Sequence, residues 1–239
     1  MTRTAALAMD AHGGLDRWRR LKTMSARLLQ DGVFWTVKGH PSTLHDVHVT
    51  VDLRKEWVSH RPFGQPNLHS SFQPDRVAIE TDKGDVVEER LKPRESFKGH
   101  VFATPWDNLQ LAYFAGCAMW TYLNTPFLFA TPGVETEELQ PWQESGETWR
   151  RLKVTFPASI ATHSAVQTFY FDQHGLLKRH DYDVEISAGS TAAHYVSELK
   201  EFSGIVFPTK RRILPRLPDG KSLPEPLVVS IDLDKIVLF

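Results

Sequence analysis

The sequence predicts a mainly β protein: a single curved antiparallel sheet of about ten or eleven strands, with an N-terminal helix and a central apolar helix as a lid. Three observations support this prediction. Many short runs alternate apolar with polar residues, and one run, Leu109–Trp120, is apolar nearly all round. Seven tryptophans and fourteen phenylalanines would leave much apolar surface exposed on a flat sheet covered by two helices. We therefore expect the sheet to curl into a half-barrel around a cavity.

Composition limits the class of protein. The 239 residues are 41% hydrophobic and 24% charged, as in an ordinary globular protein. All-β domains reach about 200–250 residues without dividing, so we expect one domain over residues 1–239. The formal net charge of −1 argues against a nucleic-acid partner or an anionic membrane surface.

Two features that the sequence lacks bear on the cellular location of the protein. No stretch of the chain has the roughly 18 consecutive apolar residues of a membrane span. The segment Met1–Leu21 lacks the uninterrupted apolar core of a secretory signal. A cytoplasmic location is therefore expected.

The N-terminal segment favours two helical pieces. Alanines give residues 2–12 helix propensity, and Gly13-Gly14 ends that helix. Asp16 can cap a further turn that carries Trp18.

Strands are expected from about Ala26 onwards, where the pattern changes to a period of two. Alternation is clearest at Val47–Leu53, and Glu56–Phe63 follows closely enough to be its hairpin partner. A second hairpin joins Val77–Thr81 to Val86–Glu89 through a glycine turn. These segments predict an antiparallel meander.

The central helix is expected to begin within Thr104-Pro105-Trp106-Asp107, which offers an N-cap, a proline at the first helical position and a carboxylate near the helix N-terminus. It continues to about Leu123, and Pro126 follows its end. Because the helix shows no clear polar face, it must be buried or act as a lid.

The rest of the chain returns to strands. Pro215–Pro226 is interpreted as a hairpin loop between the last two strands, and the basic residues Lys210, Arg211 and Arg212, with Arg216, as a solvated strand edge. The predicted strands are Trp149–Phe156, Val166–Phe171, Leu176–Ile186, His194–Phe202, Ile205–Leu214 and Leu227–Phe239.

Motifs of the standard cofactor enzymes are missing. The sequence has no nucleophile elbow, no phosphate-binding glycine loop and no dinucleotide fingerprint, so no cofactor is expected. No metal is expected either, since His45 and His48 are three apart on a strand and point to opposite faces. Cys117 is the single cysteine, which excludes an internal disulfide, and we expect it to be a buried apolar residue.

Aromatic residues of the first strands and the apolar helix are candidates to line a ligand pocket. Plain core packing accounts for them equally well. They are Trp35, Trp57, Trp106, Tyr113, Phe114, Trp120, Tyr122 and Phe127.

Three titratable residues have the phase of apolar strand positions. His180 and Tyr182 share phase with Val184, and His194 shares phase with Val196. Near a cavity these side chains would bind or protonate a ligand. The alternative is that they are core polar groups with satisfied hydrogen bonds.

The order of these elements resembles the lipoprotein-carrier fold of the LolA, LolB and LppX type. The resemblance covers nearly the whole chain and is one of pattern: an N-terminal helix ending in Ala11-His12-Gly13-Gly14, a long meander with one helical insertion, a Tyr170-Phe171-Asp172 hairpin, and Ile205–Arg212 before a final strand. It implies an incomplete barrel whose concave side binds an acyl chain or another hydrophobe under a helical lid. The chain lacks the signal peptide and lipobox cysteine of the carriers. The VioE-like branch of this fold, which is cytosolic, implies instead a cofactor-free enzyme.

Three functions stay open at this point. The first is binding of a hydrophobic or aromatic small molecule, such as a lipid, in the concave face of the half-barrel. The second is a cofactor-independent enzyme of secondary metabolism that uses the same pocket, with His180, Tyr182 and His194 as its catalytic residues. The third is a structural or interaction protein, because sheet edges and exposed aromatics also form dimers; a homodimer is compatible with all three.

Overall fold

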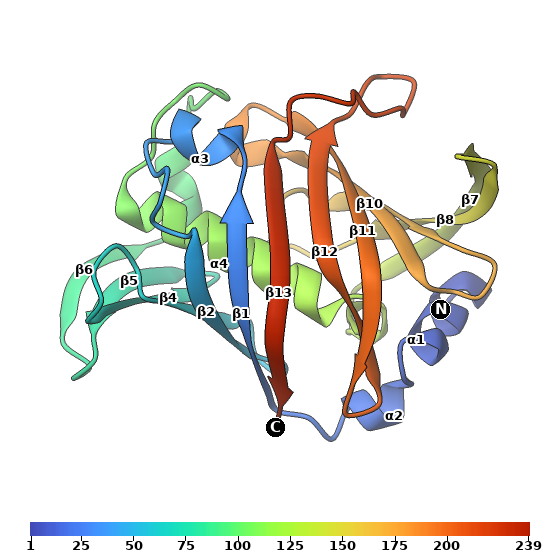
Figure 1. Ribbon diagram of the computed structural model, residues 1–239, viewed down its shortest axis with the longest axis horizontal. Coiled ribbons are helices and arrows are strands. Elements are labelled where there is room, and N and C mark those ends of the chain that lie inside the picture. The colour runs from blue at the N-terminus through green and yellow to red at the C-terminus, as the bar shows by residue number, and fades with distance from the viewer.

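One antiparallel sheet of 13 strands curves around a buried helix in the computed structural model, which describes residues 1–239 (Figure 1). The strands are β1 (Thr23–Asp31), β2 (Asp46–Asp52), β3 (Trp57–Arg61), β4 (Leu68–Gln73), β5 (Arg76–Thr81), β6 (Val86–Leu91), β7 (Glu135–Glu144), β8 (Glu147–Thr155), β9 (Val166–Phe171), β10 (Leu177–Val184), β11 (Ser190–Phe202), β12 (Ile205–Pro215) and β13 (Val229–Leu238). The helices are α1 (Arg3–Ala11), α2 (Leu15–Trp18), α3 (Val33–Val37) and α4 (Asn108–Asn124), with 3-10 turns η1 (Pro93–Phe97), η2 (Phe127–Ala130) and η3 (Glu185–Ser187).

The sheet consists of two meanders joined by its first and last strands. Its order is β6-β5-β4-β3-β2-β1-β13-β12-β11-β10-β9-β8-β7, so each strand pairs with its sequence neighbour except where β1 pairs with β13. Strands β6 and β7 are the two free edges, and the barrel stays open. The predicted fold class, a single curved antiparallel sheet with an N-terminal and a central helix, is confirmed.

Two strands and one helix were not anticipated. Strand β4 carries His69, Ser70 and Ser71 at its centre, and most side chains of the edge strand β7 are exposed or half-buried, so neither shows a regular apolar alternation. Helix α3 contains Trp35, which we had placed in a strand. No helix is long and apolar enough to cross a bilayer.

Helix α4 begins three residues later than predicted. Its N-cap is Asp107, whose carboxylate accepts a 2.8 Å hydrogen bond from the Gln110 N–H, while the Gln110 side chain accepts one from the Asp107 N–H at 3.1 Å. Thr104 instead accepts a hydrogen bond from the Val101 N–H, and Pro105 precedes the helix. Asp107 caps the helix because Gln110, at the third helical position, completes a reciprocal pair of hydrogen bonds with it, whereas Thr104 has no such partner.

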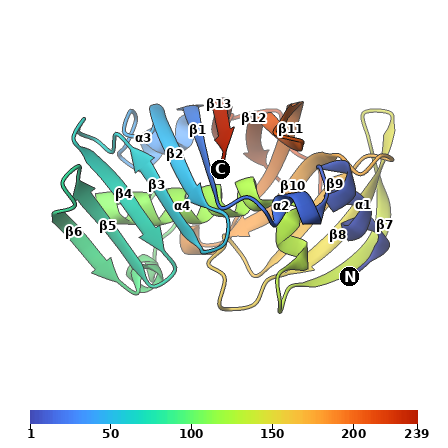
Figure 2. The same ribbon diagram turned by 90° about the horizontal axis from the view of Figure 1, so that it is seen from below.

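Helix α4 is buried along its length inside the curve of the sheet (Figure 2). All residues from Leu109 to Asn124 are buried, including Cys117, and they belong mostly to one hydrophobic core of 54 residues. The helix approaches β4 so closely that a Cβ atom on Gly116 would lie 2.2 Å from the Phe72 ring. The expectation of a helix covered on all sides is met.

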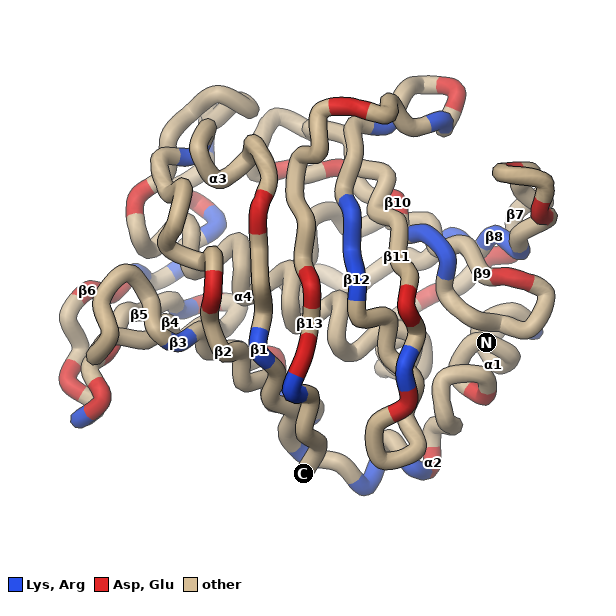
Figure 3. Tube along the Cα trace, viewed as in Figure 1, with Lys and Arg blue, Asp and Glu red and all other residues tan.

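The interpretation of Lys210–Arg212 as a strand edge is wrong. These residues lie on β12, between β11 and β13 in the middle of the sheet (Figure 3). Lys210 and Arg212 face outwards and pair with Glu198 and Asp232. Arg211 points to the concave side and is 1% exposed. Charge alone predicted an edge, whereas strand phase places the middle residue inwards.

Candidate ligand-binding site

A cavity of about 300 Å³ lies between α4 and the concave face of the sheet. Fifteen of its twenty lining residues are hydrophobic, and its volume is at the lower end of the range of small-molecule pockets, about 300–1,000 Å³. The lining comprises Phe114, Ala115, Ala118, Met119 and Tyr122 of α4; Gln30, Phe34, Trp35 and Phe102; and Tyr182, Val184, Ser190, Thr191, Ala192, Ile213, Pro215, Pro226, Val228, Val229 and Ile231 from β10–β13 and their loops.

The mouth of the cavity lies where lining residues reach solvent, at Phe102, Thr191 and Pro226. The loop that carries Phe102 is fastened by Lys38. The buried Lys38 ammonium donates hydrogen bonds to the carbonyl oxygens of Phe102 at 2.6 Å and Thr104 at 3.2 Å, and it lies 4.4 Å from the Trp106 ring centroid. These contacts hold Phe102 over the opening.

The inner end of the cavity is polar. Tyr122 of α4 and Tyr182 of β10 both line it, and their hydroxyl groups are hydrogen-bonded to each other. The Tyr122 hydroxyl also lies 3.1 Å from Nε2 of His163, whose ring stacks on Tyr182 at 4.6 Å. We call Tyr122, His163 and Tyr182 the tyrosine–histidine cluster.

Burial keeps this cluster neutral. It lowers the pKa of His163 to about 3 and raises the pKa values of Tyr122 and Tyr182 above their ordinary value near 10. At pH 7 both phenols are protonated and the imidazole is uncharged. The cluster can therefore donate hydrogen bonds without carrying charge.

His180 and His194 lie next to the cluster but do not line the cavity. They face each other across β10 and β11. His180 donates from Nε2 to Gln167 at 2.5 Å and stacks on Phe169, while Nε2 of His194 lies 3.4 Å from Nη1 of Arg211. Burial lowers the pKa values of both histidines well below 6.5, so both are neutral at pH 7.

Arg211 places a buried positive charge near this end of the cavity. Its Nη2 donates to the Tyr122 carbonyl at 3.2 Å, and its guanidinium carbon lies 5.3 Å from the Tyr122 ring centroid. It forms no salt bridge within 4.0 Å, and its Nε has no hydrogen-bond partner. Burial lowers the pKa of Arg211 to about 10, so it remains charged at pH 7.

The predicted site residues are thus divided by the structure. Trp35, Phe114, Tyr122 and Tyr182 line the cavity, and His180 and His194 face the same side of the sheet. The remaining aromatics pack elsewhere: Trp57 donates to Ser71, Tyr113 contacts Phe72, Trp120 donates to the carbonyls of Asp52 and Lys55, Phe127 stacks on Trp18, and Trp106 packs between Phe34, Phe97 and Phe114.

One stripe of α4 explains this division. Phe114, Ala118 and Tyr122 are spaced four residues apart and share a helix face, which is the face over the cavity. Tyr113 and Trp120 lie on other faces of the same helix. Arg211 was missed because its basic neighbours suggested an edge, although it has the strand phase of the lining residue Ile213.

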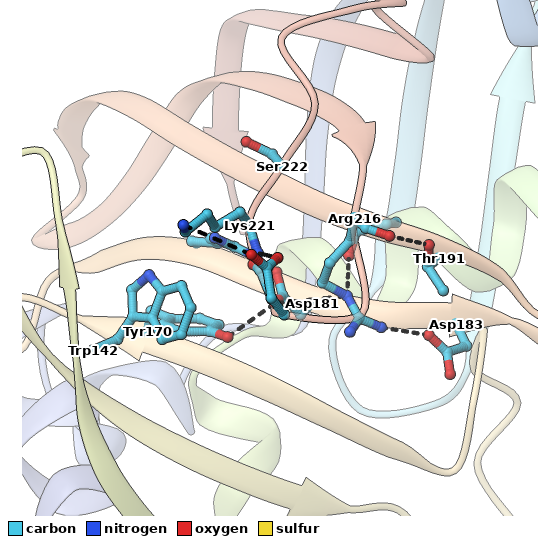
Figure 4. Close-up of polar contacts among 12 residues, drawn as sticks. Trp142, Tyr170, Asp181, Asp183, Thr191, Arg216, Lys221 and Ser222 are labelled. Carbon is cyan, nitrogen blue, oxygen red and sulfur yellow. Dashed lines mark hydrogen bonds and ion pairs between the residues drawn. The ribbon is translucent and has the colours of Figure 1, made fainter.

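The convex face of β10 carries a second buried polar network, in which every buried side-chain nitrogen and oxygen has a partner; Figure 4 shows the part of it around Tyr170 and Asp181. Arg179 donates to Asp181 at 2.6 Å and to Glu144 at 2.9 Å, and the Tyr170 hydroxyl donates to Asp181 at 2.9 Å. Arg179 also donates to the Gly220 carbonyl at 2.5 Å. This network fastens the predicted 215–226 loop between β12 and β13, whose Pro215 and Pro226 line the cavity.

Comparison with solved structures identifies the fold of the chain. No family model and no curated protein matches the sequence. A DUF1329 family protein from Desulfovibrio piger matches 98% of this chain and 93% of its own, with a TM-score of 0.54 at 11% identity. A Vibrio parahaemolyticus domain described as an outer membrane lipoprotein-sorting protein matches 98% and 93%, with a TM-score of 0.51 at 10% identity. The chain has a LolA-like fold.

A LolA superfamily protein from Nitrosomonas europaea also matches 96% of this chain and 92% of its own, with a TM-score of 0.49 at 9% identity. At such identities the likeness establishes architecture alone. Within this LolA-like half-barrel, most of the concave face is filled by α4 and the core. The cavity is the part of the concave face beside β10–β13 that they leave open.

Proposed function

We propose that the protein binds a hydrophobic or aromatic small molecule in the cavity beneath α4. The observation that carries this proposal is the cavity itself, whose apolar walls and few convergent polar groups are typical of ligand sites. Unfilled apolar space costs stability, so an apolar ligand of matching shape would be bound favourably. The likeness to a lipoprotein-sorting domain supports a lipid or acyl chain as one ligand class.

The first experiment is native mass spectrometry, with denaturing extraction, of protein purified from its own host. A copurifying lipid or aromatic metabolite is expected and would identify the ligand chemistry. A clean apo mass, together with no mobile region around the cavity in hydrogen exchange, would favour the structural or interaction alternative.

Cavity-filling variants test whether the cavity is the binding site. Ala118 and Ala192 both line the cavity, so Ala118→Phe and Ala192→Phe should weaken binding of the neutral fluorescent probe N-phenyl-1-naphthylamine by about tenfold or more, the scale of a lost buried side chain's contacts. Ala158→Phe, at an exposed position away from the cavity, is the matched control. Equal affinity in all four proteins would place the probe elsewhere.

A second candidate is a cofactor-independent enzyme of secondary metabolism, of the VioE-like kind. The bonded pair of neutral tyrosine hydroxyls at the inner end favours it, because Tyr182 reaches the cavity and can donate a proton. His180 and His194 would then act behind Tyr182 rather than on the substrate. If Tyr182→Phe, His180→Ala and His194→Ala all leave turnover of the copurified molecule unchanged, this alternative fails.

Location and assembly also remain predictions. Fractionation of producing cells tests the cytoplasmic location expected from the sequence. Light scattering after size exclusion tests a homodimer.

A further inference from the structure

The inner end of the cavity lies beside a buried positive charge that no carboxylate neutralises. Arg211 pairs across the sheet with Ile231 and is two residues from Ile213, and both of these line the cavity. The ring of Tyr122, another lining residue, lies against the guanidinium at 5.3 Å. One side chain therefore separates this charge from the cavity.

Hydrogen-bond accounting leaves a spare donor in the tyrosine–histidine cluster. Two hydroxyls and one neutral imidazole carry three protons, but only two hydrogen bonds join them, Tyr122 to Tyr182 and Tyr122 to His163. Nδ1 of His163 has no partner. With the proton on Nδ1, this N–H is the unused donor; with the proton on Nε2, it is the hydroxyl of Tyr122 or of Tyr182, and both of these residues line the cavity. In both arrangements one acceptor oxygen is missing.

Arg211 also has a structural role, which does not account for its charge. Pro126, four residues after Tyr122, has no N–H, so Arg211 donates to a carbonyl at the C-terminus of α4 that has no helical partner. A helix C-terminus carries about half a negative charge at most. The groups that surround the guanidinium, Tyr122, Tyr182 and His194, with His180 and His163 beyond them, are all neutral at pH 7, and Nε stays unpaired.

We propose that the ligand is an apolar acid, whose carboxylate enters first and stops at Tyr122 and Tyr182. There a tyrosine hydroxyl of the tyrosine–histidine cluster, left as the spare donor when the His163 proton is on Nε2, binds one carboxylate oxygen, and the charge of Arg211 stabilises the anion. The chain or ring system of the ligand fills the apolar part of the cavity towards Phe102. This inference rests on the proposed function and specifies its ligand class.

The test compares two ligands with the same chain and different heads, decanoate and 1-decanol, by calorimetry on delipidated protein at pH 7. Decanoate should bind about tenfold or more tightly than decanol, as a charge-assisted hydrogen bond in a dry site requires. Arg211→Met should remove most of that preference and leave decanol affinity nearly unchanged. Arg212→Gln, the neighbouring arginine on the convex face, is the matched control and should retain the preference.

Two more variants keep the test decisive if Arg211→Met fails to fold. Arg211→Lys retains the charge and should retain part of the preference, whereas Tyr182→Phe removes a hydroxyl and should reduce it. Equal binding of decanoate and decanol to the wild type overturns the acid inference and leaves the proposed function standing. Preference for decanoate that survives both Arg211→Met and Tyr182→Phe also overturns it. Failure of both ligands, and of N-phenyl-1-naphthylamine, overturns the proposed function instead.

Discussion

The stability of the protein should respond very differently to the same substitution at its two fully buried arginines. Arg179 and Arg211 are 0% and 1% exposed, but Arg179 is paired with Asp181 and Glu144, whereas Arg211 has no acidic partner. Replacing Arg179 by methionine leaves Asp181, 5% exposed, without its main counter-ion. Breaking a buried ion pair in this way costs about 3–5 kcal/mol, so Arg179→Met should be strongly destabilising.

Arg211→Met should be close to neutral. A pKa lowered from 12.5 to about 10 means that burial disfavours the charged form by about 3 kcal/mol, at about 1.4 kcal/mol per pH unit, and methionine removes that cost. Against this, the Tyr122 carbonyl loses its donor, worth about 1–3 kcal/mol, and the contact with the Tyr122 ring is lost, worth about 0.5–2 kcal/mol. The terms cancel to within about 2 kcal/mol.

Urea unfolding followed by far-ultraviolet circular dichroism measures both free energies, provided that the m-values of the variants match that of the wild type. Arg179→Met should lower the unfolding midpoint clearly more than Arg211→Met. If Arg211→Met lowers the free energy of unfolding as much as Arg179→Met does, the charge of Arg211 is compensated within the folded protein. The reasoning that assigns an acidic ligand to the cavity is then refuted.

Two further predictions concern stability. Burial raises the pKa of the Glu56 carboxyl to about 8, so between about pH 4.5 and pH 8 the folded protein holds a proton that the unfolded chain releases. The stability contributed by Glu56 is therefore complete below pH 4.5 and is lost as the pH rises through 8. Glu56→Gln keeps an acceptor for the Ala161 N–H and should gain melting temperature relative to wild type from pH 5 to pH 8.5; a constant difference would contradict the assignment. Gly116→Ala should lower the melting temperature, because overpacking against Phe72, about 1–3 kcal/mol, exceeds the gain of about 1 kcal/mol in helix propensity; an unchanged or higher melting temperature would count against this close approach.

Local sequence patterns determined the class of structure and the direction of many side chains. Alternation at Val47–Leu53 and the turn at Asp82–Asp85 are set by neighbours along the chain, so the hairpins they predict are found as β2–β3 and β5–β6. The same period of two placed His180, Tyr182 and His194 on the inner face, because a strand has only two faces.

The tertiary structure decided which side chains meet the cavity. Helix α4 is apolar all round and so has no phase of its own; only its packing against β3–β5 turns Phe114 and Tyr122, rather than Tyr113 and Trp120, towards the cavity. Arg211 became a candidate site residue only when β12 was found between β11 and β13. The pairing of β1 with β13 joins strands from opposite ends of the chain and unites the two meanders into one sheet around α4. A contact over such a sequence distance leaves no signal in either segment alone.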